Sequence, residues 1–156
     1  MERRILIVVW MMFGVGLAGT RGLRPVRIRD AEGVEQMVYS RSAALVIGNG
    51  NGYRLGEWRR FPHGTEDAKR VAKALEENGF AVTLKLDVNR KEFDRAFYAF
   101  LAEHGDDPNA RLLFYYSGHG FTEKLANGTS HGSLVMVDTP NPEKDPAGYA
   151  RTSVSM

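Results

Sequence analysis

One segment, Arg111 to Phe121, restricts the fold of this chain more than any other. Its sequence is RLLFYYSGHGF, in which five apolar or aromatic residues follow Arg111 without glycine or proline, as in a strand buried on both faces. The strand is followed at once by a Gly-His-Gly loop centred on His119. In open parallel sheets, ligands bind beyond the carboxyl ends of the strands, and histidine transfers protons near neutral pH. The segment predicts a central strand that positions a functional histidine, although a turn with an incidental histidine remains an alternative.

Short apolar runs alternate with segments of helical periodicity along the rest of the chain, which predicts an α/β fold with a mostly parallel sheet. Thr65 is the expected N-cap of the first helix, and Asn78-Gly79 is its expected end. Asn89 or Asp87 would cap the second helix. The predicted strands are residues 43–48, 80–86, 111–116 and 133–137, and the predicted helices are residues 65–78 and 89–104.

The segments outside this alternation carry weaker patterns. Residues 20–41 contain two short alternating runs around Asp30-Ala31-Glu32-Gly33, which predicts a β-hairpin ahead of the main domain. Residues 121–130 are expected to form a polar, flexible loop. Residues 141–156 are rich in Pro, Asp and Gly, and no helix or strand is expected there.

Composition excludes several classes of protein. The chain has 156 residues, enough for one domain, and a formal net charge of +2, which does not indicate a nucleic-acid partner. It has no cysteine, so disulfides, thiolate metal sites and a thiol nucleophile are all excluded within these residues. Its four histidines are scattered without metal-ligand spacing, so we expect no metal site.

Residues 1–19 are expected to be a targeting segment rather than part of the fold. Two arginines precede an uncharged apolar stretch, and Gly16 and Ala18 have the spacing of a cleavage site. The stretch is shorter than the roughly 20 residues of a membrane span, which favours export to the periplasm or medium. The alternative is an uncleaved membrane anchor formed by residues 5–19.

Two other catalytic or binding patterns are weak. The glycine-rich residues 48–52, GNGNG, raise the alternative of a nucleotide site, but a helix N-terminus does not follow at once as phosphate binding requires. Ser117 lies in YYSGHG rather than in the G-x-S-x-G pattern of serine hydrolases.

Five short motifs in order give the chain a family resemblance. They are Ile-Gly-Asn at 47–49, Asp-Ala at 67–68, Asn-Gly-Phe at 78–80, Tyr-Tyr-Ser-Gly-His-Gly at 115–120 and Leu-Val-Met-Val-Asp at 134–138. Over residues 41–150 the chain resembles the caspase-like cysteine peptidases, and within them the bacterial metacaspase-like members. The resemblance implies a three-layer caspase-like fold and a cysteine-type endopeptidase. The domain would occupy residues 42–156.

The resemblance also implies roles for four residues. His119 matches the histidine that exchanges protons with the cysteine nucleophile, and Gly120 matches the residue whose backbone N–H stabilises the oxyanion. Asp67 and Ser117 match positions that line the pocket for an Arg or Lys side chain of a protein substrate. Helix capping remains an equal alternative for Asp67, and loop hydrogen bonding the favoured one for Ser117.

The chain departs from the family at the nucleophile. The family's cysteine lies about 50 residues after the histidine, which places it near position ~170. The sequence ends at Met156 and contains no cysteine. We therefore expect a caspase-like domain that stops before its nucleophile strand and is inactive alone. Two interpretations stay open, a peptidase carrying the histidine half of its site and an inactive fragment that acts as a binding or assembly module. No cofactor is expected, and calcium dependence is left open.

Overall fold

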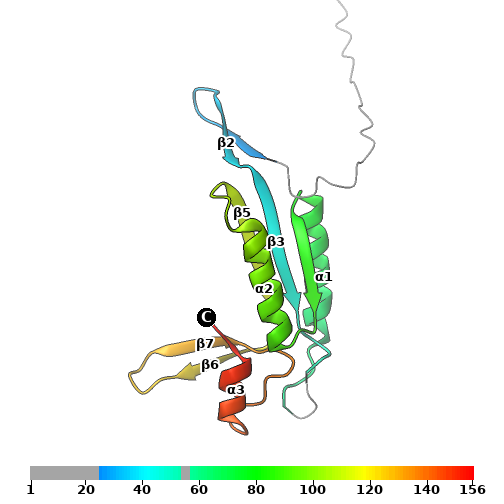
Figure 1. Ribbon diagram of the computed structural model, residues 1–156, viewed down its shortest axis with the longest axis vertical. Coiled ribbons are helices and arrows are strands. Elements are labelled where there is room, and N and C mark those ends of the chain that lie inside the picture. Colours follow the sequence, from blue (N-terminus) through cyan, green and yellow to red (C-terminus); the bar gives the residue numbers. More distant parts are fainter. Residues whose placement is uncertain (1–24, 54–56) are drawn as a thin grey trace, which may run out of the picture.

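A three-stranded parallel sheet forms the centre of the computed structural model, which describes residues 25–53 and 57–156 (Figure 1). Its strands, in the order β4-β3-β5, are β3 (Arg41–Gly48), β4 (Ala81–Leu86) and β5 (Ala110–Ser117). The predicted targeting segment, residues 1–19, lies outside the described residues. None of the helices in the described part of the chain is long and apolar enough to cross a membrane.

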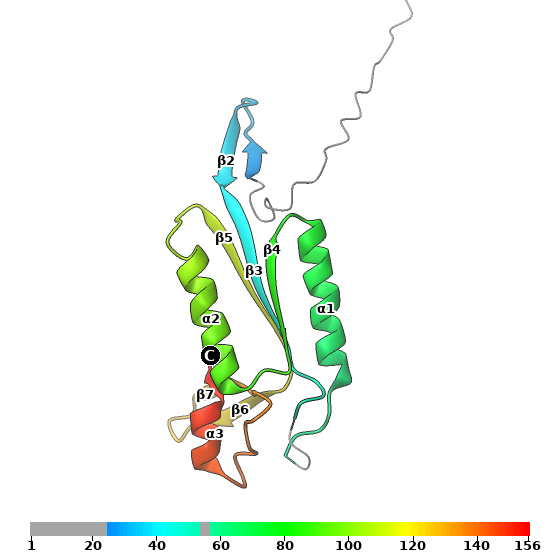
Figure 2. The ribbon, with the colours of Figure 1, turned by 45° about the vertical axis from the view of Figure 1, so that its right-hand side comes forward.

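Two helices cover opposite faces of this sheet, α1 (Pro62–Glu77) and α2 (Arg90–His104) (Figure 2). Side chains of β3 alternate between them, so Ala44 and Val46 pack under α1, whereas Leu45 and Ile47 pack under α2. Both faces of β3 are therefore buried, as expected of a strand in a parallel sheet between helices. The predicted α/β fold with a parallel sheet is confirmed, and so are the three strands and two helices that build it.

A β-hairpin precedes the sheet, as the sequence predicts. It consists of β1 (Val26–Arg29) and β2 (Glu35–Tyr39), which pair antiparallel. The turn includes Gly33 at φ +82°, a conformation that glycine adopts without steric cost.

The start of α1 differs from the prediction. The helix begins at Pro62, so Thr65 is not its N-cap but a buried residue whose hydroxyl donates to the carbonyl of Pro62. The residue before the helix, Phe61, has no capping side chain, and its N–H donates to the carbonyl of Gly50 instead. Proline at the first helical position has no N–H to satisfy, and the N–H of Gly64, the third helical residue, donates to the Phe61 carbonyl at 2.9 Å, which explains how the helix starts without a capping side chain. In α2 the prediction holds, because Asn89 forms a capping box with Glu92.

The predicted fourth parallel strand, residues 133–137, is wrong. A second, antiparallel sheet lies beyond the carboxyl ends of the parallel strands, and residues 133–134 belong to it (Figure 1). Its strands are β6 (Gly120–Lys124), β7 (Ser130–Leu134) and β8 (Val154–Ser155). Residues 135–137 are an apolar link rather than a strand, since the N–H of Val135 donates to His119 and that of Val137 donates to Val88. The loop expected over residues 121–130 is in fact most of the β6–β7 hairpin.

Residues 141–156 also contain more structure than predicted. The short helix α3 (Pro146–Thr152) begins at a proline, and the side chain of Asp145 caps it by accepting from the N–H of Gly148. Tyr149 of this helix packs against Phe121 of β6, with ring centroids 5.6 Å apart. A seven-residue helix is too short to show apolar periodicity, so the sequence pattern could not reveal it.

Candidate functional site

The His119 loop lies at the carboxyl edge of the parallel sheet, as predicted. It connects the end of β5 at Ser117 with the start of β6 at Gly120. Glycine is needed at position 118, because a Cβ there would lie 2.5 Å from the Tyr116 hydroxyl and 2.8 Å from the Tyr53 hydroxyl. This close approach fixes how the chain leaves β5 and therefore where His119 is presented.

The imidazole of His119 is held by the segment that precedes α1. Its Nε2 lies 2.5 Å from the carbonyl oxygen of Arg59. The ring stacks on Trp58 at 5.6 Å between centroids and packs against Tyr53 at 4.8 Å and Phe61 at 5.9 Å. A backbone carbonyl and three aromatic rings therefore orient the imidazole.

The contact with Arg59 also assigns the protons of His119. A carbonyl oxygen can only accept, so Nε2 must carry a proton to make this hydrogen bond. In the neutral imidazole the lone pair then resides on Nδ1, the other ring nitrogen. His119 is thereby prepared to accept a proton at Nδ1.

The segment that supplies this carbonyl is itself anchored to residues after β7. The indole of Trp58 donates to the carbonyl of Thr139 at 2.8 Å, and the carboxylate of Glu57 accepts from the N–H of Asn141 at 2.9 Å. These bonds fix the backbone on both sides of the Arg59 carbonyl, since Phe61 is held by Gly50.

Two tyrosines, the buried Tyr53 and the half-buried Tyr116, hold the backbone of His119. The Tyr53 hydroxyl accepts from the N–H of His119 at 2.9 Å, and the Tyr116 hydroxyl donates to the carbonyl of Val135 at 2.6 Å. Val135 closes the network, because its N–H donates to the His119 carbonyl at 3.0 Å. Burial raises the pKa of both tyrosines, and the neighbouring Tyr53 raises that of Tyr116 further. Both hydroxyls therefore stay protonated and keep their hydrogen bonds.

Asn49, fully buried, joins the ends of the three parallel strands. Its side chain accepts from the N–H of Val88 at 2.9 Å and donates to the carbonyl of the same residue. Its own N–H donates to the carbonyl of Ser117, at 2.8 Å. Asn49 thus links the end of β3 to the residues that follow β4 through its side chain, and to the end of β5 through its backbone N–H.

The glycine-rich loop after β3 binds a carboxylate of the protein itself. The N–H groups of Gly50, Asn51 and Gly52 all donate to Oδ1 of Asp87, at 2.8, 3.0 and 3.0 Å. Asp87 has φ +50°, a conformation uncommon for residues other than glycine. The amides that would bind a phosphate are thus occupied by this carboxylate.

Three of the four predicted site residues, Ser117, His119 and Gly120, lie together at this loop because they are neighbours in the sequence. Gly120, exposed, begins β6, and the carbonyl of Ser117 accepts from Asn49. Asp67 is the sixth residue of α1, which starts at the same edge of the sheet, and its Oδ1 lies 3.9 Å from Arg70. The alternative role of Asp67 as a helix cap is wrong, since the first turn of α1 contains no acidic residue.

The residues that hold His119 were missed from sequence, namely Tyr53, Trp58, Arg59, Phe61 and Val135, and so was the role of Asp87 in binding the glycine-rich loop. Arg59 and Val135 act through backbone atoms, and Tyr53, Trp58 and Phe61 lie in loops without periodicity, so no motif marks them. Over the ranges 25–53 and 57–156, no group of three or more His, Asp or Glu side chains could hold a metal ion.

A comparison with protein families gives this geometry a context. A family model described as the Caspase domain matches residues 41–146, more than half of the chain. The match runs from the start of β3 to the start of α3 and includes the His119 loop. No curated protein matches the chain.

Proposed function

The chain belongs to the caspase domain family of proteases, and from this premise we propose that it carries the histidine half of a cysteine-type endopeptidase site. The observation that supports this function best is the bond from His119 Nε2 to the Arg59 carbonyl. It leaves Nδ1 as the proton acceptor, and the aromatic rings around the imidazole prevent it from turning away.

In the proposed reaction, His119 Nδ1 takes the proton from a cysteine thiol and the thiolate attacks the scissile carbonyl. The C–S bond forms as the carbonyl π pair moves onto oxygen, where the backbone N–H of Gly120 stabilises the oxyanion. The oxyanion collapses, the C–N bond breaks, and the imidazolium returns its proton to the leaving amine. Water then releases the acyl group by the same steps. The cysteine must come from outside the 156 residues, which contain none.

The proposal extends to the substrate. Members of a protease family act on proteins, and Asp67 offers a carboxylate that is 44% exposed on a helix starting at the site edge. A carboxylate favours a cationic side chain, so we assign the chain to the metacaspase-like members that cleave after Arg or Lys. Ser117, next to the His119 loop, would line the same pocket.

The first prediction concerns His119 as the base. When residues 1–156 are joined to the cysteine-bearing segment of a caspase domain protease, we expect hydrolysis of Arg-amide peptides. His119→Ala should then lower kcat/KM by about 10³-fold or more, because the thiol loses its proton acceptor. His63→Ala is the matched control, since His63 is an exposed residue near the start of α1. Equal activity in the His119→Ala protein would contradict the assigned role.

The second prediction concerns Asp67. In the same joined protein, a substrate with citrulline in place of arginine should be cleaved about tenfold or more slowly, because citrulline has the shape of arginine without its charge. Asp67→Asn should remove this preference, whereas Glu66→Gln, one residue away and paired with Lys69, should keep it. An unchanged preference in Asp67→Asn would assign the specificity to another residue.

A second candidate function is a non-catalytic binding or assembly module. The observation in its favour is the absence of cysteine from the sequence. The two candidates differ in one outcome, since a module would give no His119-dependent hydrolysis even with a cysteine segment joined to it.

A further inference from the structure

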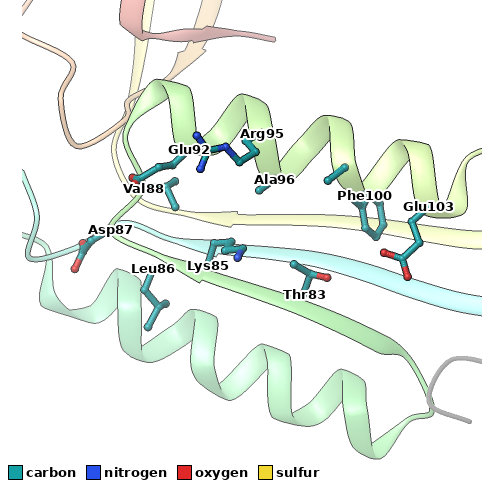
Figure 3. A pocket seen from close by; sticks show the side chains of 11 residues that line it. Thr83, Lys85, Leu86, Asp87, Val88, Glu92, Arg95, Ala96, Phe100 and Glu103 are labelled. Carbon is teal, nitrogen blue, oxygen red and sulfur yellow. The ribbon is translucent and has the colours of Figure 1, made fainter. Parts of the chain in front are cut away.

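A groove lies between the edge strand β4 and helix α2, with a cavity volume of about 490 Å³. Figure 3 shows Thr83 and Lys85 on the strand side of the groove, and Arg95, Ala96 and Phe100 on the helix side. Since β4 and β5 are the two edges of the parallel sheet, this groove is on the edge opposite the strand that leads to His119.

The groove exists because α2 does not cover β4 completely. Phe93 and Phe97 of α2 pack against Phe114 of β5, with ring centroids 6.0 and 5.7 Å apart. The helix is thereby drawn toward the β5 side of the sheet. On β4, the residues facing α2 beyond Ala81 are polar, Thr83 and Lys85, so they remain open to a ligand.

The outer edge of β4 has backbone groups without a partner strand in the described part of the chain. The N–H of Asp87 donates to the carbonyl of Gly48, so the odd-numbered residues of β4 direct their backbone groups toward β3. The even-numbered residues Val82, Leu84 and Leu86 therefore direct theirs outward. This edge can accept another strand by main-chain hydrogen bonds.

The acidic and basic side chains of the groove differ in how many partners they have. Two of its carboxylates have hydrogen-bond partners, since Asp87 accepts three backbone N–H groups and Glu92 accepts the N–H of Asn89. The third, Glu103, is 75% exposed at the end of the groove and lies 3.8 Å from His104, which pairs with it only when protonated. In contrast, Lys85 and Arg95 form no ion pair with any residue in the ranges 25–53 and 57–156. The groove therefore offers two free cations beside a free strand edge.

We infer that this groove binds an extended acidic peptide segment of a partner protein, which adds to β4 as a further strand. Alternate side chains of an added strand point to the α2 face of the sheet, where Lys85 and Arg95 lie. Acidic side chains at these alternate positions would pair with the two cations, and the backbone would bond to the edge of β4. The inference does not depend on the proposed peptidase activity.

The test uses the full chain and an octapeptide of alternating glutamate and threonine, with binding measured by fluorescence anisotropy. Lys85→Gln combined with Arg95→Gln should weaken binding by about tenfold, since two charge pairs are lost. Lys91→Gln is the matched control, because Lys91 is an exposed residue of α2 outside the groove and should leave binding unchanged.

Two modified peptides separate strand addition from charge attraction alone. N-methylation of one alternate set of peptide amides should abolish binding, because these amides would face β4, and methylation of the other set should not. The inference is overturned if the unmodified peptide does not bind, if a lysine–threonine peptide binds as well, or if both methylated peptides bind equally. It is also overturned if Lys91→Gln weakens binding as much as the double substitution.

Discussion

The 156-residue chain alone is expected to release no detectable product from Arg- or Lys-amide peptides. A covalent peptidase needs a nucleophile, and no residue of this sequence is a cysteine. Removing the nucleophile from such a mechanism lowers kcat by roughly 10⁶-fold, and only binding and oxyanion effects remain. A fluorogenic peptide assay with the purified chain, at several concentrations of protein, measures the rate.

The control for this experiment is His119→Ala, which should give the same background rate as the unchanged chain. Cleavage that depends on His119 would contradict the account, because it would require a nucleophile other than cysteine. A Ser–His contact lies away from this loop among the described residues, between Ser155 Oγ and His131 Nε2 at 3.2 Å. Its serine is exposed, so a His131→Ala variant distinguishes activity at this pair from activity at His119.

The parallel sheet and its helices could be predicted because their apolar residues follow local patterns, although the start of α1 does not. The strand at Arg41–Gly48 is a continuous apolar run, as burial on both faces requires. Asn89 carries the capping box of α2 in four consecutive residues. Where local preference and tertiary packing agree, the sequence is sufficient to locate the element.

The errors arise where an apolar run serves something other than a strand. Val135 and Met136 are fully buried, and their burial alone resembles that of β3. Their backbone groups bond to the His119 loop and to Thr139 instead of a neighbouring strand. Apolar residues indicate burial, but they do not reveal which hydrogen-bond partners the backbone will find.

The candidate site, too, could be predicted from the sequence only in part. His119 could be identified because it follows a recognisable strand between two glycines. Its partners could not, since the carbonyl of Arg59 and the hydroxyl of Tyr53 come from residues 60 and 66 positions away in the chain. A backbone carbonyl has no sequence signature, so only the folded chain reveals the group that orients the histidine.

Gly48→Ala should have a large effect on stability, because β3 and α1 approach each other closely at this position. A Cβ at Gly48 would lie 2.5 Å from the Cβ of Ala68 and 2.7 Å from the carbonyl oxygen of Gly64. Both atoms belong to α1 and neither is the end of a movable side chain, so the helix would have to shift. Overpacking of this kind lowers the free energy of unfolding by about 3 kcal/mol.

The matched control is Gly120→Ala, which introduces the same methyl group at the same edge of the sheet. A Cβ at Gly120 would meet only the carbonyl of Ser133, at 3.6 Å, so the free energy of unfolding should change by less than about 0.5 kcal/mol. Urea denaturation of the two variants and the unchanged chain measures both values. Because the shifted helix follows directly from the segment holding Arg59, Gly48→Ala should also disturb the His119 ring in NMR spectra. Equal unfolding midpoints for Gly48→Ala and Gly120→Ala would contradict the close contact between β3 and α1.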